Sequence, residues 1–382
     1  MWWRGLGGTL ALWAGGLVLV RAILVPGETC EDATAANVRP SAIRAASWIE
    51  RVQHPDGSYL YEYDRDARAE VPGYNIVRHA GVTMSLWQLA AEGEKQYLAP
   101  AEHGFAWMQA RLVHREDWTA LQSDNSDLEL GANALMLAGL LQYRDATGDT
   151  SRDDLMRGVA RFLVRMQRPD GGFTAEWRAG DDGPYLPARS RYATGEAFWA
   201  LALMHNRFPD EGWDRPSRAV ADYLSLHRDE VENFKFPPWA DQWAAYGLSE
   251  MAGWGLSDAN IAYARSLADR FGFLIRVEAQ RSDKPWSKVV HGRNARAAGM
   301  GTWVEGLDSL WRIADADPRM ADMKQDIADR VACGAGMLVA RQQPPPSQPG
   351  VFDPVADAWF TEGKTRMDDQ QHALSALLKA EA

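Results

Sequence analysis

The chain has 382 residues, of which 46% are hydrophobic and 24% are charged, and its formal net charge is −11. This charged fraction is ordinary for a folded protein, so the composition excludes a disordered chain. Nucleic-acid binding requires concentrated Lys and Arg, and the acidic balance argues against it. The chain has two cysteines, Cys30 and Cys333, which excludes a disulfide-dense scaffold and a cysteine-rich zinc module.

Residues 1–27 contain an uncharged, mostly apolar stretch between Arg4 and Arg21. It is long enough for a signal-peptide core and slightly short for a spanning helix, which needs about 20 residues. No small-residue cleavage site follows, so an uncleaved signal anchor is favoured over a cleaved signal peptide. The remaining alternative is a buried helix of a cytosolic protein.

The charges around this segment indicate its orientation. Arg4 precedes it and several acidic residues follow it, which favours a domain outside the cytoplasm, on the periplasmic or extracellular side. Cys30 and Cys333 would then meet an oxidising environment. The sequence leaves open whether they pair.

Residues 28–40 are interpreted as a linker, and from residue 41 a helical period dominates while alternating strand runs are scarce. Twelve helices are predicted, and they alternate in character. The first set is amphipathic and charged, as expected of outer helices with one solvated face: 41–53, 100–112, 152–167, 215–227, 258–277 and 320–342. The second set is rich in Ala, Gly and Trp, as expected of helices buried on most sides: 74–91, 128–143, 192–206, 239–252, 300–314 and 366–380.

Alternation of outer and inner helices over six hairpins predicts an all-α (α/α)6 toroid, with residues 41–382 as a single domain. The connections from outer to inner helices are long, and they gather at the N-terminal ends of the inner helices. Long loops in a compact domain are usually functional. We therefore expect the mouth of an active site at that end of the toroid.

Two predicted outer helices end in similar turns, QHPDGSY at 53–59 and QRPDGGF at 167–173, with a looser copy at 342–352. Pro and Asp-Gly favour a tight turn, and the aromatic residue packs back on the hairpin. The turns resemble repeats of the terpenoid cyclase and prenyltransferase toroids. The acidic signature of the squalene-cyclising enzymes is absent, so terpenoid cyclisation is the least favoured function.

The plan of twelve helices, with polar and Trp residues in the first turns of the inner helices, resembles the six-hairpin glycosidase group. That group includes inverting glycosidases, uronic-acid lyases and hydrolases, and the N-acylglucosamine 2-epimerase family. The resemblance covers about residues 41–380 and implies a carbohydrate-active enzyme.

Each predicted inner helix carries a polar or aromatic residue followed by Ala or Gly, and a second residue one turn earlier. Residues at i and i−4 share a helix face, so these two sets predict two stacked rings lining the toroid axis. The first ring is His79, Asn133, Glu196, Trp243, Glu305 and His372, and the second is Asn75, Glu129, Tyr192, Trp239, Gly301 and Asp368.

Carboxylates on such apolar helices must be paired, protonated or functional. Glu196 and Glu305 lie on inner helices two apart, and we expect their carboxyl groups within roughly 6–9 Å, the separation that an inverting glycosidase needs. They are the candidate acid and base of hydrolysis, with Asp368 and Asp369 positioning water or substrate. The alternative is that these carboxylates pair with nearby arginines and hold helix ends together.

His79 and His372 occupy equivalent positions on the first and last inner helices, which ring closure would make neighbours. Paired histidines suit proton abstraction and return at a sugar carbon, the chemistry of an epimerase or lyase. They resemble the catalytic histidines of the 2-epimerase family. The alternative is a hydrogen-bonded seam that clamps the first hairpin to the last.

Aromatic rings stack on sugar faces, and polar side chains bond sugar hydroxyls. The expected substrate-binding residues are Asn75, Arg78, Glu129, Asn133, Tyr192, Trp239, Asp241, Trp243 and Trp303. Nucleotide-binding and zinc-protease motifs are absent, so the sequence predicts no cofactor and no metal.

The favoured interpretation is a glycoside hydrolase that acts on an envelope or secreted polysaccharide and is held to the membrane by its N-terminal helix. The alternatives are the epimerase or lyase, and a non-catalytic toroid that binds glycan or scaffolds an envelope synthesis complex. Partners from envelope biosynthesis are part of this expectation.

Overall fold

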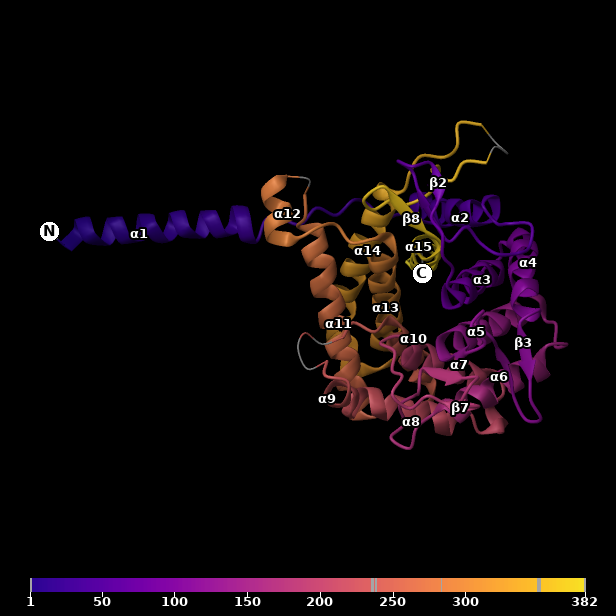
Figure 1. Ribbon diagram of the computed structural model, residues 1–382. Coiled ribbons are helices and arrows are strands. Elements are labelled where there is room, and N and C mark those ends of the chain that lie inside the picture. Colours follow the sequence, from indigo (N-terminus) through magenta and orange to yellow (C-terminus); the bar gives the residue numbers. More distant parts are fainter. Residues whose placement is uncertain (1, 235–236, 238, 283, 349–351, 381–382) are drawn as a thin grey trace.

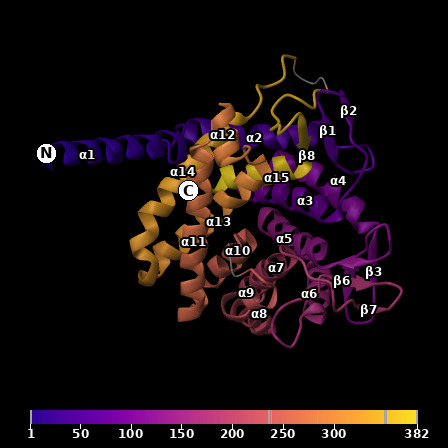
Figure 2. The same ribbon diagram turned by 60° about the vertical axis from the view of Figure 1, so that its left-hand side comes forward.

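A computed structural model describes residues 2–234, 237, 239–282, 284–348 and 352–380. Six helical hairpins in a closed ring make up most of the described chain (Figures 1 and 2). The outer helices are α2 (Ala35–Arg51), α4 (Leu98–Gln109), α6 (Asp153–Met166), α8 (Asp214–Leu226), α11 (Asp258–Ala279) and α14 (Lys324–Arg341). The inner helices are α3 (Ile76–Ala91), α5 (Leu130–Thr147), α7 (Ala193–Arg207), α10 (Gln242–Met251), α13 (Ala297–Ala316) and α15 (Met367–Lys379).

The inner helices form an unbroken ring. Each contacts the next in chain order, and α15 closes the ring against α3. All twelve predicted helices are present and alternate between the two layers, so the predicted all-α (α/α)6 toroid is confirmed.

Sequence patterns explain the two layers. Outer helix α6 buries Met156, Val159, Phe162 and Leu163 on one face, and its first turn carries acidic residues that favour the helix dipole. Inner helix α5 is instead buried on every side from Leu130 to Leu141, as its content of Ala, Gly and Leu favours.

Several helix starts differ from the predicted ones. Helix α2 begins at Ala35 instead of residue 41, because the Thr34 backbone N–H donates to Asn37 Oδ1 (2.8 Å) in a capping box. Helix α10 begins at Gln242 instead of residue 239, since Asp241 accepts from the Ala244 N–H and caps it.

Short strands lie in the connections from outer to inner helices. They are β1 (Glu62–Asp64), β2 (Ala69–Glu70), β3 (Leu112–His114), β4 (Thr119–Leu121), β5 (Leu128–Glu129), β6 (Glu176–Arg178), β7 (Gly183–Pro184) and β8 (Lys364–Arg366). They form three antiparallel sheets, β2-β1-β8, β3-β4 and β5-β6-β7. In the first, Tyr63 lies opposite Thr365, so the loop before α3 is tied to the loop before α15.

The repeated Gln-x-Pro-Asp-Gly turns join neighbouring hairpins. Gln53 Nε2 donates to the carbonyls of Gly57 (3.2 Å) and Pro100 (3.0 Å), the latter in outer helix α4. Gln167 makes the same two bonds, to Gly171 and Pro216. Gln342 Nε2 donates to Ser41 O (3.1 Å) and thereby links the last outer helix to the first.

The N-terminal helix α1 (Trp2–Leu19) and the π-helical turn η1 (Val20–Leu24) project from the ring (Figure 1). The segment Gly7–Leu24 has a mean hydropathy of 1.6, is not buried, and is long and apolar enough to cross a membrane. By length and composition alone, it fits both the anchor and the signal sequence that the chain's first residues suggested.

The segment after η1 is fastened to the outer layer. Cys30 and Cys333 form a disulfide to α14, which settles the pairing that the sequence left open. Glu28 pairs with Arg276 of α11 and with Arg330 of α14. The remaining short helices are α9 (Arg228–Val231), α12 (Pro285–His291), η2 (Lys95–Tyr97), η3 (Pro209–Glu211), η4 (Ala252–Trp254) and η5 (Pro318–Met323).

Candidate active site

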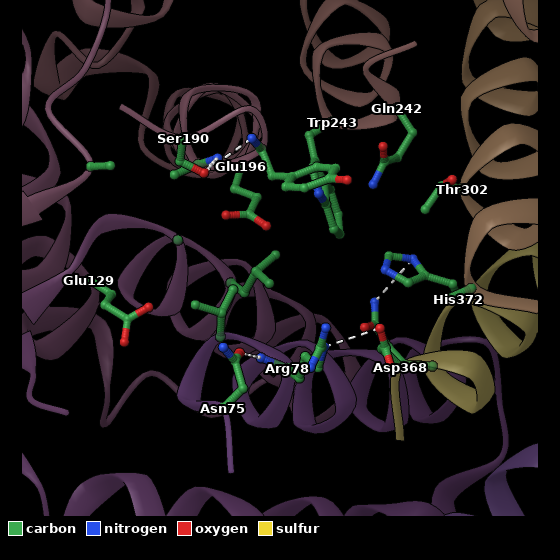
Figure 3. Close-up of a pocket in the computed structure, with 18 of the residues that line it drawn as sticks. Asn75, Arg78, Glu129, Ser190, Glu196, Gln242, Trp243, Thr302, Asp368 and His372 are labelled. Carbon is green, nitrogen blue, oxygen red and sulfur yellow. Dashed lines mark hydrogen bonds and ion pairs between the residues drawn. The ribbon is translucent and has the colours of Figure 1, made fainter. Parts of the chain in front are cut away.

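A cavity of about 830 Å³ opens at the N-terminal ends of the inner helices (Figure 3). All six inner helices, or the residues that directly precede them, contribute to its wall. Its charged and polar lining includes Asn75, Arg78, Glu129, Ser190, Tyr192, Glu196, Gln242, Thr302, Asp368 and His372. The cavity therefore lies where the long connections gather, at the end of the toroid expected from the sequence.

Glu196, in the first turn of α7, extends its carboxyl group into this cavity (Figure 3). Its side chain reaches across to α5, where Gly131 makes room for it: a Cβ atom there would collide with the carboxyl oxygen. The residue is only 4% exposed. Burial, together with the negative charges of Asp241 and Glu129, raises the pKa of Glu196 to about 8. At neutral pH this carboxyl group therefore holds a proton that it can donate.

Glu129 precedes α5 and lines the same cavity. Its carboxylate accepts a hydrogen bond from the Ser123 hydroxyl (2.8 Å), which fixes its orientation. Its charge is close enough to contribute to the raised pKa of Glu196. One cavity therefore contains two carboxyl groups, and burial together with the charge of Glu129 favours the neutral form of Glu196.

His372 and Glu305 form a second polar pair between α15 and α13. His372 Nδ1 lies 3.0 Å from Glu305 Oε2, and the Glu305 side chain is fully buried behind the imidazole. Burial by itself would lower the pKa of His372, but the charge of Glu305 and its hydrogen bond outweigh burial and raise it. Within the described residues nothing bonds Nε2 of this ring, which leaves that nitrogen for a ligand.

The two adjacent acidic residues of α15 have different surroundings. Asp368 lines the cavity and pairs with Arg78 (3.1 Å) and Arg366 (3.1 Å). Asp369 is 1% exposed, pairs with Arg296 and accepts from the Ala298 N–H (3.1 Å). Asp369 thus holds the start of α13 against α15 instead of facing the cavity.

Helices α3 and α15 are neighbours, as ring closure predicted, but the expected pairing of His79 with His372 is wrong. His79 Nδ1 is bonded to the Tyr74 hydroxyl (2.6 Å) and Nε2 to the Gly104 carbonyl (2.8 Å), and the ring stacks on Trp107 at 4.3 Å. Burial lowers the pKa of His79 to about 4 and keeps it neutral. It therefore clamps α3 to outer helix α4 and does not line the cavity.

Two other members of the predicted first ring, Asn133 and Glu305, also turn away from the cavity. Asn133 bonds both backbone groups of Leu121 in β4, and Glu305 stands behind His372, so it does not face Glu196 across open space as expected. Asp241 is fully buried, caps α10 and pairs with Arg228. Each is aimed at a neighbouring element that the sequence pattern did not specify.

The other predicted residues lie at the mouth. Asn75, Arg78, Glu129, Tyr192, Glu196, Trp243, Asp368 and His372 line the main cavity, whereas Trp239 and Trp303 line a smaller one beside it. Gly301 packs against the His372 backbone. Sequence reasoning missed Gln242, Thr302 and Gln371. Each is the sequence neighbour of a residue in the two predicted rings. Successive helical residues point about 100° apart, so the cavity lining on each inner helix is wider than the single line of residues that the rings assumed.

Among the described residues, no group of three or more His, Cys, Asp or Glu side chains is arranged to hold a metal ion.

No family model matches the sequence, and no curated protein matches it. Solved structures with similar folds include the GH76 alpha-mannanase from Bacteroides thetaiotaomicron (TM-score 0.60, 11% identity, covering 90% of this chain and 95% of that chain). Another is the cellobiose 2-epimerase from Spirochaeta thermophila (TM-score 0.61, 12% identity, covering 91% of this chain and 97% of that chain). A third is an inactive variant of the alpha-1,6-mannanase from Salegentibacter in complex with alpha-1,6-mannotetrose (TM-score 0.62, 11% identity, covering 90% of this chain and 98% of that chain).

These similarities show the fold. The chain has the (α/α)6 architecture of the six-hairpin glycosidase-like proteins, as the sequence resemblance implied.

Glu196 predicts a pH dependence of folding stability. Between its ordinary pKa of 4.5 and about 8, the folded state holds a proton that the unfolded state has released. The contribution of Glu196 to the free energy of unfolding is therefore most favourable at and below pH 4.5, and it falls as the pH rises toward 8. The slope approaches about 1.4 kcal/mol per pH unit.

Urea unfolding of wild-type protein and of Glu196→Gln at pH 5, 6.5 and 8 measures this effect. The variant should lack the part of the slope that Glu196 causes, while the exposed control Glu92→Gln should keep it. A Glu196→Gln protein with the wild-type slope would contradict the assignment.

Proposed function

We propose that this protein is a carbohydrate-active enzyme that hydrolyses a glycosidic bond, with Glu196 as the general acid. The observation that carries the proposal is the buried Glu196 carboxyl group, kept protonated at neutral pH and exposed to a cavity large enough for sugar units. Protonation of the leaving oxygen is the step that hydrolysis of a stable acetal needs. Similar folds among alpha-mannanases, one in complex with an oligosaccharide, support the substrate class.

Glu129 is the second carboxylate of the proposed reaction. It replaces Glu305, because Glu305 is occupied by His372 and has no access to the cavity. On the side of the sugar away from the leaving group, the Glu129 carboxylate either attacks the anomeric carbon itself or takes a proton from the water that attacks it. Arg78 and Asp368 bond substrate hydroxyls from the wall opposite Glu196 (Figure 3). Trp243 and Tyr192, which also line the cavity, provide faces for sugar rings.

A second candidate function is proton transfer at a sugar carbon, as in an epimerase. It is favoured by His372, whose Nδ1 is held by Glu305 while Nε2 is left for a ligand. A similar fold in a cellobiose 2-epimerase and in a D-mannose isomerase supports the same class. Since His79 is sealed behind α3, Glu196 would have to be the second proton carrier. The open cavity argues against a toroid that only scaffolds other proteins.

A screen of purified protein against alpha-1,6-mannan and bacterial envelope polysaccharides, scored by new reducing ends, tests hydrolysis. On the substrate that is cleaved, Glu196→Gln should lower kcat by about 10²–10⁴-fold because it removes the proton donor. Glu92→Gln is the control that should retain activity. Full activity of Glu196→Gln would contradict the proposal, and exchange of solvent deuterium into a sugar without new reducing ends would favour the epimerase.

The proposed location is outside the cytoplasm, with α1 as a membrane anchor. Three observations support this location. Gly7–Leu24 is apolar and unburied, and Cys30 is joined to Cys333, as expected in an oxidising compartment. The short helix α12, which exposes Trp286 and Val289, lies beside η1, where the His291 ring bonds Leu24 O (3.1 Å). Apolar side chains next to the end of the span suit a membrane surface.

Fractionation of a bacterial host that expresses the full chain tests the location. We expect the protein to remain in the membrane fraction after a carbonate wash, and protease added to spheroplasts to digest the ring. Cys30 and Cys333 should resist alkylation until a reductant is added. Recovery from the cytosol with both thiols free would overturn the proposed location. Recovery from the periplasm without α1 would show that the segment is a cleaved signal.

A further inference from the structure

A second cavity, of about 520 Å³, lies beside the active site and belongs to no function described above. Tyr192 lines both cavities and stands between them. The wall of the smaller cavity combines segments far apart in the chain, since Trp239 precedes α10, Arg270 lies on α11, and Trp303 on α13. A saccharide chain that occupies the active site and passes Tyr192 would enter this second cavity.

The walls of the second cavity are aromatic. Trp239 meets the edge of Tyr192 with ring centroids 5.4 Å apart, and it stacks with Phe234 at 5.7 Å. Trp303 adds a fourth ring from α13. The indole N–H of Trp239 is buried and has no hydrogen-bond acceptor among the described residues. Aromatic faces with a donor left free are the arrangement that holds a sugar ring and one of its oxygens.

The two arginines of this cavity, Arg191 and Arg270, have no anionic partner among the described residues. Arg191 lies over the rings of Phe234 and Trp239 at 5.3 and 5.2 Å, and Arg270 extends from α11. Within the described part of the chain, neither guanidinium group has a carboxylate within 4.0 Å. The acidic residue of the lining, Glu232, accepts from the Tyr223 hydroxyl (2.6 Å) and faces Arg189 (3.9 Å).

The active-site cavity is different in this respect. There, Arg78 and Arg366 pair with Asp368, and Arg296 pairs with Asp369. Those guanidinium groups are neutralised by the protein itself, whereas the charges of Arg191 and Arg270 are left for a ligand. A guanidinium group is a strong, planar donor to carboxylate, sulfate and phosphate groups.

We propose that the second cavity binds a saccharide unit that carries an anionic group, adjacent to the sugar in the active site. This inference rests on the proposed function, since it describes the substrate of the same site. The aromatic walls hold the ring, and Arg191 and Arg270 bind the anionic substituent. The substrate is therefore an acidic polysaccharide, with its charged unit next to the bond that is cleaved.

Calorimetric titration of the full chain in detergent with matched tetrasaccharides tests the proposal. The probes are oligogalacturonate and oligoglucuronate for carboxylates, their methyl esters as neutral counterparts, and a carrageenan tetrasaccharide for sulfate. Wild-type protein should bind an acidic probe at least about tenfold more tightly than its neutral counterpart, with a preference that falls as salt is added. The carboxylate and sulfate probes distinguish the two sources of charge.

Variants separate this site from the catalytic one. Arg191→Gln and Arg270→Gln should each reduce the preference for the acidic probe about tenfold, whereas Arg270→Lys retains part of it. Arg265→Gln, which removes an exposed pair on the same helix α11, should leave the preference unchanged. Thermal unfolding of each variant identifies any that fail to fold.

Several results would overturn the inference: equal affinity of wild-type protein for acidic and neutral probes, binding of no acidic probe, or an unchanged preference in both arginine variants. Failure of the proposed function would look different. In that case the acidic preference persists and depends on Arg191 and Arg270. Wild-type protein, however, releases no reducing ends from any polysaccharide, or Glu196→Gln releases as many as wild-type protein does.

Discussion

The structure depends on closure of the ring. An inner helix such as α5 is apolar on every side and can be stable only when it is covered by two inner neighbours and the outer layer. The last hairpin must therefore meet the first. The contact of α15 with α3, the pairing of β8 with β1 and the bond from Gln342 to Ser41 all serve this closure. Closure brings the first turns of six helices, distributed over most of the chain, around one cavity.

A polar group in such an apolar ring is either satisfied by the protein or available to a ligand. Most are satisfied: His79 clamps α3 to α4, Asp241 caps α10, and Asp369 joins α13 to α15. The exceptions are informative because burial makes an unsatisfied polar group costly. Glu196 avoids that cost by remaining protonated, which gives it the property of a general acid. Among the described residues, His372 Nε2 in the main cavity and the guanidinium groups of Arg191 and Arg270 in the smaller cavity beside it are also left without a protein partner that neutralises or bonds them.

The sequence predicted the fold well and the site only in part. The alternation of amphipathic and uniformly apolar segments identifies the two layers because burial on one side or on all sides directly controls composition. The Gln-x-Pro-Asp-Gly turns were also recognisable, since their residue types are needed locally. The strands were missed because segments of two or three residues carry no measurable period.

The orientation of single side chains could not be predicted. Rotation by one helical residue moves a side chain by about 100°, enough to turn it from the cavity to an outer helix. His79 and Arg78 illustrate this: the first bonds Gly104 in α4, and the second lines the cavity. The partners that decide these orientations, Trp107 for His79 and Leu121 for Asn133, lie on other elements. The Cys30–Cys333 pair, 303 residues apart, depended in the same way on tertiary structure.

The central claim is that the toroid holds Glu196 neutral at the pH where it acts, and infrared difference spectroscopy tests it most directly. At pH 6.5, the spectrum of wild-type protein minus that of Glu196→Gln should contain the carbonyl stretch of a protonated carboxyl group. That band should disappear as the pH rises through about 8. A difference spectrum at pH 6.5 that contains only carboxylate bands would contradict the account.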